Sequence, residues 1–352
     1  MTGTRIKFGI VGCGHASKSH ARALLQLPGA ELAAACDTDA GALENFTRLY
    51  SISGYLHYEE MLEKEKSLDV VIICTPSELH SEMGIMAAHR GKHVLMEKPV
   101  ALSLENADRL ISACEKEGVS LSVVLQNRFR PAMQILKIAV DGGKFGRLSH
   151  GVATVRWNRN DNYYNRCPWR GSRDKGGGVL MNQAIHSVDA LQWIMGGVDN
   201  VTAQTATRYR PIDAEDVGLA MLNFQGGALG LIEAASTVYP CNLEETIAIF
   251  GERGTVVIGN EKGGKIRAWD FCDFIGKEQA MYICAGAEEH NDTGHLAVLR
   301  DLTDAMQKGC RPAVDGHEGR KSLELVLGIY QSAQTGRPVP LPLPVDGGNY
   351  RD

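Results

Sequence analysis

The sequence predicts an α/β domain with a parallel sheet, followed by an α+β domain with a large, open, mainly antiparallel sheet. Three observations lead to this prediction. The chain has 352 residues, more than a single hydrophobic core usually supports. Its first third alternates short apolar runs with helical stretches, whereas later segments are closely spaced strands joined by tight turns. We place the domains at residues 1–125 and 126–352.

Short, continuously apolar segments define the strands expected in the first domain. Because their residues are apolar on both sides, they are typical of a parallel sheet that is covered on both faces by the intervening helices. The expected strands are residues 6–11, 31–37, 69–76, 93–99 and 119–125.

Alternating patterns replace these runs in the second domain. A helix is expected at 131–140, a strand at 150–159 and a strongly apolar helix at 178–195. Within 199–270, alternation such as Val217, Leu219 and Met221 indicates strands buried on one face, and two further helices are expected near 295–308 and 317–335.

The bulk composition argues against several classes of partner. A net charge of −5 gives no general attraction to nucleic acid or anionic membranes, and no apolar run approaches the roughly 20 residues needed to span a bilayer. The N-terminal segment lacks the pattern of a secretory signal. Nine cysteines without a CxxC pair favour free thiols over disulfides or zinc ligands. We therefore expect a cytoplasmic protein that binds neither nucleic acid nor membrane, with no metal.

A glycine-rich turn follows the first expected strand. Gly12 and Gly14 match the first two positions of GxGxxG, and Ser17 occupies the third. The first glycine permits a tight turn, the second lets the backbone approach a pyrophosphate, and the following helix directs its N-terminal amides at the phosphates. This turn predicts a dinucleotide site.

Asp37 ends the second expected strand, about twenty residues beyond the glycines. A carboxylate at that point accepts hydrogen bonds from the ribose hydroxyls and repels a 2′-phosphate, which favours NAD over NADP. The alternative is that Asp37 caps the next helix.

Several motifs resemble those of the Gfo/Idh/MocA oxidoreductase family, in that family's order and over nearly the whole chain. They are GIVGCG (9–14), TPSELH (75–80), EKP (97–99), QNRFRP (126–131), GGGVLMNQAIHSVDALQWIMG (176–196) and the C-terminal VDGHEGRKSLELVLGIYQSAQTGRPV. PWRG together with LMNQAIHSVD is most similar to nucleotide-sugar (UDP-N-acetylhexosamine or uronate) 3-dehydrogenases and glycoside 3-oxidising members.

The resemblance implies a Rossmann domain, a homodimer or homotetramer built on the large sheet, and Lys98 and His186 beside the nicotinamide. Partial burial and the positive nicotinamide would lower the pKa of Lys98 and favour a neutral amine that accepts a proton. Pro99 is a candidate for a cis peptide bond. We expect the NAD-binding residues to be Gly12, Gly14, His15, Ala16, Asp37, Thr75, Pro76, His80, Glu97 and Lys98.

The apolar helix expected at 178–195 carries a polar stripe. Asn182, His186, Asp189 and Trp193 follow one another at spacings of four, three and four, which places them on one helical face. Many family members carry Asp where this chain has Asn182. An amide orients His186 without stabilising its imidazolium by charge, so Lys98 takes a larger share of the proton transfer unless Asp189 supplies the missing charge.

Arginines and aromatic residues are interleaved between 156 and 173. Guanidinium groups bind phosphate or carboxylate, and aromatic faces stack on sugars or bases, so this stretch is a candidate substrate loop. The alternative is a solvated or subunit-contacting loop. The expected substrate-binding residues are Arg128, Tyr163, Trp169, Arg170, Asn182 and Asp189. His290 and His295 offer metal ligands, but the start of a helix explains them better.

These observations favour an NAD-dependent dehydrogenase that oxidises a secondary hydroxyl, at carbon 3, of a hexose, glycoside or nucleotide sugar. Lys98 and His186 would handle the proton. An inositol dehydrogenase, a glycosidase that oxidises its substrate transiently and a non-catalytic NAD-binding regulator remain alternatives.

Overall fold

The chain folds into two compact units in a computed structural model that describes residues 5–260, 264–289 and 294–344. The first unit consists of the chain up to Leu125 together with a second segment, Gly294–Arg320. The prediction that all of 126–352 forms the second domain is therefore wrong. The reason is that α10 (His295–Lys308) packs against α1 (His15–Leu24). The second unit holds the described residues from Gln126 to Glu289 and those from Lys321 onward.

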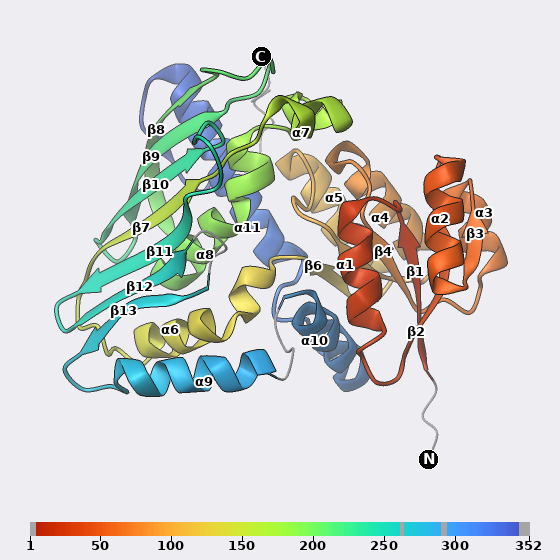
Figure 1. The fold of residues 1–352 in the computed structure, drawn as a ribbon, viewed down its shortest axis with the longest axis horizontal. Helices are drawn as coiled ribbons and strands as arrows, with labels where there is room; N and C mark the ends of the chain where they lie inside the picture. Colours follow the sequence, from red (N-terminus) through yellow and green to blue (C-terminus); the bar gives the residue numbers. More distant parts are fainter. Residues whose placement is uncertain (1–4, 261–263, 290–293, 345–352) are drawn as a thin grey trace. The chain divides into compact units, whose positions relative to one another are not determined.

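The first unit is built on a six-stranded parallel sheet with the order β3-β2-β1-β4-β5-β6 (Figure 1). Helices cover both faces: α1 packs with α10, and α4 packs with α5. The strands are β1 (Ile6–Val11), β2 (Ala30–Cys36), β3 (Ser53–Tyr55), β4 (Val70–Ile73), β5 (His93–Met96) and β6 (Leu121–Val123), and the remaining helices are α2 (Ala40–Tyr50), α3 (Tyr58–Lys64), α4 (His80–His89) and α5 (Leu104–Lys116).

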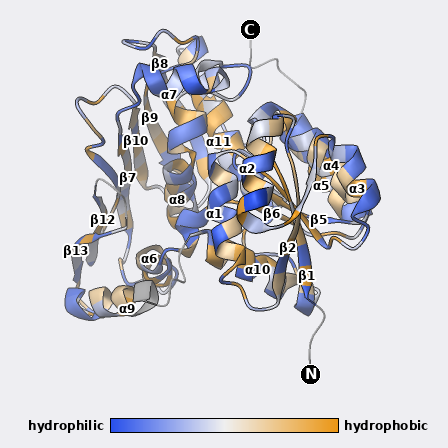
Figure 2. Cartoon of the chain, turned by 45° about the vertical axis from the view of Figure 1, so that its right-hand side comes forward, coloured by the Kyte–Doolittle hydropathy of each residue, from blue (hydrophilic) through white to orange (hydrophobic). Residues whose placement is uncertain are grey.

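The hydrophobic core of this unit explains why its strands read as apolar runs. All four residues of β4, at the centre of the sheet, are fully buried. Colouring by hydropathy shows the same strands as a hydrophobic layer between helices (Figure 2). The parallel α/β prediction is confirmed.

The second unit is built on an eight-stranded sheet with the order β13-β12-β11-β7-β10-β9-β8-β14 (Figure 1). Its pairs are antiparallel except β7 with β10, so the predicted mainly antiparallel sheet is confirmed. The strands are β7 (Leu148–Arg156), β8 (Val198–Ala206), β9 (Val217–Phe224), β10 (Leu229–Ala235), β11 (Glu244–Gly251), β12 (Gly254–Asn260), β13 (Ile266–Phe271) and β14 (Val339–Pro340).

Helices cover one face of this sheet. The helix α8 (Ile185–Met195) packs on β7 and β11. In α11 (Gly316–Thr335), Ser322 donates to Asp189 of α8 and Ser332 accepts from Ala203 N–H of β8. On the opposite face, Leu219 and Met221 of β9 and Leu229 and Leu231 of β10 are exposed. Burial on one face of β9 is thus confirmed, but Leu219 and Met221, whose spacing indicated the buried face, lie on the exposed one, and the alternate residues face the helices. The other helices are α6 (Pro131–Asp141), α7 (Asp161–Arg166) and α9 (Lys277–Glu289).

Short elements account for most of what the sequence patterns missed. The strand β3 has three residues and α3 has seven, which is too short for a clear period. The helix α9 also escaped prediction because its hydrophobic residues do not follow one face. Thiols remain free at all nine cysteines. No helix within the described ranges is long and apolar enough to cross a bilayer.

Candidate active site

The glycine turn between β1 and α1 has the conformation that the sequence predicts. Gly12 has φ +91°, and a Cβ there would lie 2.7 Å from the carbonyl oxygen of Cys74, so only glycine fits. Gly14 is the opposite case, because a Cβ built on it meets nothing within 4 Å. The backbone before α1 is therefore open to a close ligand, as pyrophosphate binding at a helix N-terminus requires.

Asp37 connects this turn to the end of β2. One carboxylate oxygen accepts a hydrogen bond from the backbone N–H of Cys13 at 2.7 Å, and the other accepts from Asp39 N–H at 2.8 Å. The helix cap of α2 is Asp39, whose side chain accepts from Ala42 N–H. The alternative that Asp37 caps the helix is therefore wrong, and its carboxylate lies where a ribose is expected.

The other residues expected near the dinucleotide begin helices that follow strands. His15 and Ala16 form the first turn of α1, and Ser17 is fully buried with its hydroxyl donating to the carbonyl of Gly14 at 2.9 Å. Thr75 and Pro76 follow β4 at the carboxyl edge of the sheet, where open α/β sheets bind ligands. The hydroxyl of Thr75 is buried and has no hydrogen-bond partner among the described residues.

His80 departs from its predicted role as a cofactor contact. Its ring is 1% exposed, with Nδ1 2.7 Å from the carbonyl oxygen of Pro99 and Nε2 3.1 Å from that of Thr75. Burial lowers the pKa of His80. His80 thus holds the loops after β4 and β5 together, and both of its ring nitrogens face backbone carbonyls of the protein.

Glu97 is held by two histidines from other parts of the first unit. Nε2 of the fully buried His20, on α1, lies 2.9 Å from Oε1 of Glu97, and Nε2 of His295, at the start of α10, lies 3.8 Å from the same oxygen. Burial by itself would raise the pKa of Glu97, but hydrogen bonds and charge from the two histidines outweigh it and hold that pKa well below its ordinary value. Glu97 is therefore a carboxylate that joins α1, α10 and the end of β5.

The same three side chains also form a candidate metal cluster, since their ligand atoms lie within 4.8 Å of one another. The 2.9 Å contact from His20 accounts for the arrangement without an ion, and burial lowers the pKa of His20, which makes it a neutral donor to Glu97. We assign the cluster to the positioning of Glu97. His290, the other histidine considered for metal binding, lies outside the described residues.

Lys98 follows Glu97 directly, beyond the end of β5. Its backbone N–H donates to Oε2 of Glu97 at 3.3 Å, and its peptide bond to Pro99 is cis, as expected. The side chain is half-buried. The carboxylate of Glu97 thus lies against the backbone of Lys98, the residue that the sequence motifs predict for proton transfer.

The segment carrying His186, in the second unit, is not a single α-helix as predicted. Val179–Ala184 is π-helical and α8 begins at Ile185, so Asn182 lies in the π-helical part and His186 in the first turn of α8. Both side chains are half-buried. A π-helical segment at this position is typical of functional sites because it widens the local helix.

Arg128 and Asp189 are not available for a substrate as predicted, because they bind each other. Nε and Nη2 of Arg128 donate to the two oxygens of Asp189 at 2.8 and 2.7 Å, and Ser322 donates to Asp189 as well. Both residues are at most 5% exposed. The charge of Asp189 is thereby committed to Arg128 and does not supply the missing charge beside His186.

Tyr163, Trp169 and Arg170 do lie together, and all three are half-buried. The guanidinium carbon of Arg170 lies 4.4 Å from the centre of the Tyr163 ring and 5.8 Å from that of Trp169. The hydroxyl of Tyr163 accepts from Nε2 of Gln183 at 2.9 Å, and Gln183 neighbours Asn182 in the π-helical segment. The predicted substrate loop is thus joined to the helix that carries His186.

Sequence analysis did not identify Glu215, a residue from another part of the chain that accepts hydrogen bonds from the first residues of the π-helical segment. Its carboxylate accepts from the backbone N–H of Leu180 at 2.8 Å and from the hydroxyl of Tyr330 at 3.0 Å, and its carbonyl accepts from Val179 N–H. A Cβ on Gly178 would lie 2.4 Å from this carboxylate. Burial raises the pKa of Glu215 to about 7, against the opposing effect of these hydrogen bonds.

Glu245 was missed as well. It is buried in β11 and accepts from Asn127 at 2.9 Å and from Ser187, beside His186, at 3.1 Å. A buried acid in a strand leaves no periodic signal. For Glu215, the only signal is the acidic pair with Asp216 ahead of an apolar strand.

The parallel sheet, the glycine turn and the carboxylate at the end of β2 define the first unit as a dinucleotide-binding domain. A family model described as "Oxidoreductase family, NAD-binding Rossmann fold" matches residues 6–125, and one described as "GFO/IDH/MocA C-terminal domain" matches residues 133–257. The chain therefore belongs to the Gfo/Idh/MocA family of NAD-binding oxidoreductases, and the resemblance seen in its motifs is confirmed.

Similar proteins match along nearly the full length. The WlbA dehydrogenase of Bordetella pertussis, solved with NADH and UDP-GlcNAcA, is 38% identical with a TM-score of 0.89, covering 97% of this chain and 100% of that one. The corresponding protein of Chromobacterium violaceum, solved with the same ligands, is 36% identical with a TM-score of 0.90, covering 98% of each. Myo-inositol 2-dehydrogenase of Thermotoga maritima is 27% identical, over 96% of this chain and 98% of that protein.

The position of Asp37 predicts a preference for NAD. Asp37→Asn removes the charge that repels a 2′-phosphate, so the Kd for NAD should rise roughly 10-fold while that for NADP changes little or falls. Titration of each nucleotide against intrinsic fluorescence measures both constants. Asp39→Asn, at the cap of α2, is the matched control and should leave the preference unchanged. A wild-type protein that binds NADP as tightly as NAD would contradict the assignment.

Glu215 predicts a pH-dependent stability. Its folded pKa of about 7 lies above its ordinary value of 4.5, so the folded state holds the proton more tightly. The unfolding free energy should therefore fall as the pH rises from about 4.5 to 7, by about 3 kcal/mol in the limit of a fully shifted group. In Glu215→Gln this loss should be absent.

Denaturant unfolding at pH 5, 6, 7 and 8 measures this dependence. Glu44→Gln, which changes an exposed carboxylate of α2, is the control and should retain the wild-type slope. Equal slopes in the wild type and Glu215→Gln would show that Glu215 is ionised throughout this range.

Proposed function

We propose that this NAD-dependent oxidoreductase oxidises a secondary hydroxyl, at carbon 3, of a hexose that is free, glycosidic or nucleotide-linked. The observation that carries the proposal is similarity over the full chain to two dehydrogenases of known structure that hold NADH and UDP-GlcNAcA. Lys98 and His186, which the motifs nominate for proton transfer, are both present. A regulator that only binds NAD would need neither.

Cofactor binding and proton transfer fall to different residues in this proposal. The glycine turn and the first turn of α1 hold the pyrophosphate, and Asp37 binds the adenosine ribose. When bound, NAD accepts the hydride, so the protein has to orient the alcohol and remove its hydroxyl proton. Lys98 and His186 take that proton, with the larger share on Lys98, because Asn182 offers His186 no charge and Asp189 is neutralised by Arg128.

Inositol oxidation is the second candidate, favoured by the match to myo-inositol 2-dehydrogenase. A third is a glycosidase that oxidises, eliminates and then reduces its substrate. Mass spectrometry of the purified protein would identify any nucleotide that remains bound. Incubation with UDP-sugars, glycosides, free hexoses and inositols then separates the candidates. Net NADH identifies a dehydrogenase and its substrate, whereas sugar release without NADH identifies the glycosidase.

Substitution of the two proton-handling residues tests the mechanism. Lys98→Met and His186→Ala should each lower kcat roughly 10²–10⁴-fold, the range for loss of general-base catalysis. NADH formation at 340 nm measures kcat, and NAD binding checks that the variants fold. His89→Ala and Lys308→Met, at exposed positions of α4 and α10, are controls that should keep wild-type rates. Near-normal turnover in both Lys98→Met and His186→Ala would rule the mechanism out.

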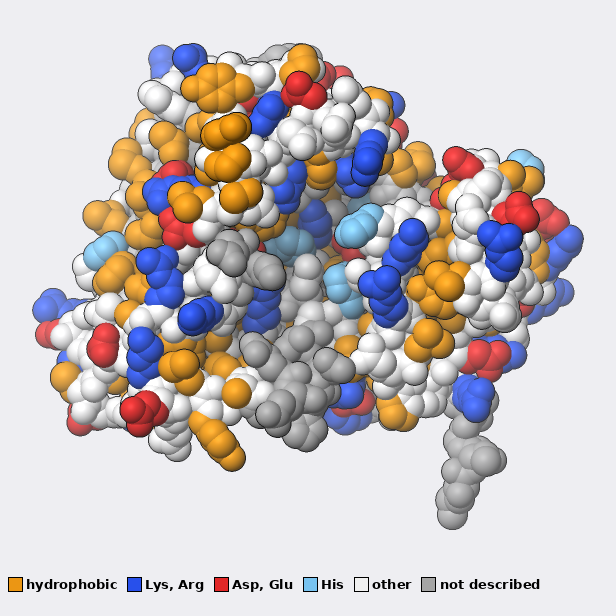
Figure 3. Space-filling model, viewed as in Figure 1, with side chains coloured by type: hydrophobic (Ala, Val, Ile, Leu, Met, Phe, Trp, Pro, Cys, Tyr) orange, Lys and Arg blue, Asp and Glu red, His pale blue; other side chains and the backbone are white. Residues whose placement is uncertain are grey.

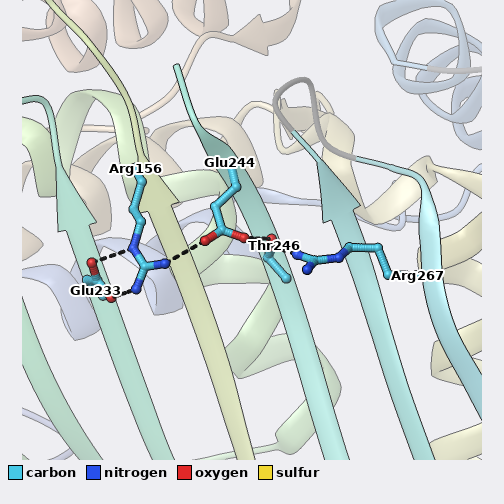
Figure 4. Close-up of polar contacts among 5 residues, drawn as sticks. All are labelled: Arg156, Glu233, Glu244, Thr246 and Arg267. Carbon is cyan, nitrogen blue, oxygen red and sulfur yellow. Dashed lines mark hydrogen bonds and ion pairs between the residues drawn. The ribbon is translucent and has the colours of Figure 1, made fainter. Parts of the chain in front are cut away.

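We also propose that the chain forms a homodimer or homotetramer through the exposed face of the larger sheet. Leu219, Met221, Leu229 and Leu231 expose apolar surface there. Beside them, Arg156 binds Glu233 and Glu244, and Arg267 binds Glu244 (Figure 4). Hydrophobic and basic side chains are also interspersed over the strands of this unit in the space-filling view (Figure 3). Such a mixed surface is typical of a protein interface.

This assembly predicts that a charge in the apolar patch dissociates the oligomer. Light scattering after gel filtration should give two or four chains for the wild type and a smaller species for Met221→Glu. Glu44→Gln serves again as a surface control. A monomeric wild type at micromolar concentration would exclude the proposed interface.

A further inference from the structure

Two arginines of the second unit share a cluster of aromatic rings, which we call the arginine–aromatic cluster: Trp157, Arg159, Tyr163, Trp169 and Arg170. The guanidinium carbon of Arg159 lies 4.5 Å from the centre of the Trp157 ring and 5.2 Å from that of Tyr163. Arg170 lies against Tyr163 and Trp169 at 4.4 and 5.8 Å. Both arginines therefore contact the ring of Tyr163.

Neither arginine has a carboxylate partner among the described residues. Within the described ranges, the side chain of Arg159 donates hydrogen bonds from Nη1 alone, to the carbonyl of Asn158 at 2.8 Å and to the side-chain oxygen of Asn242 at 3.1 Å. Its Nε is buried and has no partner among the same residues. Arg170 makes no side-chain hydrogen bond or ion pair in the described part of the chain.

Another arginine of the same stretch, unlike these two, does bind carboxylates. Arg156 lies only three residues before Arg159 and binds two carboxylates, at 2.6–2.7 Å (Figure 4). Asp161, within the same stretch, pairs with Arg210, and the side chain of Asp213 accepts from the backbone of Arg173. The cluster thus keeps two half-buried positive charges that no carboxylate of the described residues pairs with.

Half-burial of an uncompensated cation costs free energy, and ring stacking recovers only part of it. Stacking occupies the faces of a guanidinium and leaves its N–H edges for the oxygens of phosphate or carboxylate. Within the described residues, the whole fork of Arg170 and the Nη2 group of Arg159 make no hydrogen bond, so these are the donors that a ligand can meet. The cluster is also fixed to the proposed active site, because Gln183 of the π-helical segment donates to the hydroxyl of Tyr163.

We propose that Arg159 and Arg170 bind an anionic group of the sugar substrate, a phosphate or a carboxylate, so that the enzyme selects charged sugars over neutral ones. This inference rests on the proposed function and narrows it to nucleotide-linked or uronic-acid substrates. The aromatic rings hold the guanidinium planes, and the sugar places its reacting hydroxyl toward His186.

Direct binding tests the site without requiring turnover. Calorimetric titration of the NAD-loaded protein with UDP, with glucuronate and with neutral methyl glucoside separates the two anionic sources. UDP binding alone identifies phosphate as the recognised group, and glucuronate binding alone identifies carboxylate. The affinity for the anion that binds should fall as salt rises from 50 to 300 mM.

Arg159→Gln and Arg170→Gln should each raise the Kd of that anion roughly 10- to 100-fold and leave methyl glucoside unaffected. Arg170→Lys keeps the charge without the planar fork and should recover part of the affinity. Arg166→Gln, an exposed arginine of the same stretch, is the matched control. Retained NAD binding shows that each variant is folded.

The outcomes separate this inference from the proposed function. If neither anion binds the wild type, or both bind Arg159→Gln and Arg170→Gln as tightly as the wild type, the anion site is excluded. If sugars are oxidised but the variants leave the ratio of kcat/KM for charged and neutral sugars unchanged, the inference fails and the proposed function stands. If the anion binds through these arginines but no sugar reduces NAD, the proposed function fails instead.

Discussion

The carboxylate of Glu97 is the point at which three elements of the first unit are tied together. It lies at the end of β5, and it contacts His20 from the helix that follows the glycine turn. It also contacts His295, which is 198 residues away in sequence at the start of α10. A carboxylate at this depth is costly unless it is hydrogen-bonded, so its two histidine partners are a condition for its burial. The positions of Lys98 and of the helix below the pyrophosphate turn both depend on this contact.

Two buried acids, Asp189 and Glu215, connect elements of the second unit, and they differ in how their charge is compensated. Asp189 is fully neutralised by the fork of Arg128, which makes it a structural anchor of α8. Glu215 accepts hydrogen bonds from Leu180 N–H and the hydroxyl of Tyr330 and forms no ion pair within the described residues, and burial raises its pKa. Asp189 thus fixes the helix of His186 through an ion pair, whereas the contribution of Glu215 depends on its protonation.

Much of the fold follows from local sequence patterns because these patterns report burial directly. The runs that became β1, β4 and β5 are apolar on both sides of the strand. In β9 the alternation predicts a strand but not its buried face, because Leu219 and Met221 lie on the exposed side. The return of 294–320 to the first unit could not be predicted in the same way. A helix with one apolar face requires a partner, but nothing in its own sequence says which domain provides it.

In the candidate site too, local sequence predicts some residues and fails for those whose contacts are distant in sequence. Gly12 and Asp37 were predictable because each meets a local requirement, a positive φ in one case and a position at a strand end in the other. The pairing of Arg128 with Asp189 joins residues 61 positions apart, and the clamp made by His80 depends on the backbone of Pro99. Such contacts are set by tertiary packing, so residue type alone does not reveal that these side chains bind other parts of the protein.

Charge pairing then separates arginines that the sequence presents as equivalent. Arg156, Arg159 and Arg170 belong to one basic, aromatic stretch, and composition gives no reason to distinguish them. On the sheet, Arg156 is satisfied by two glutamates that arrive from the neighbouring strands β10 and β11. The other two follow the end of β7 and are held by aromatic rings that provide position without neutralising charge. A side chain that is fixed in place but electrostatically uncompensated is organised for a ligand, because the fold has already met the entropic cost of ordering it and the missing charge must come from outside.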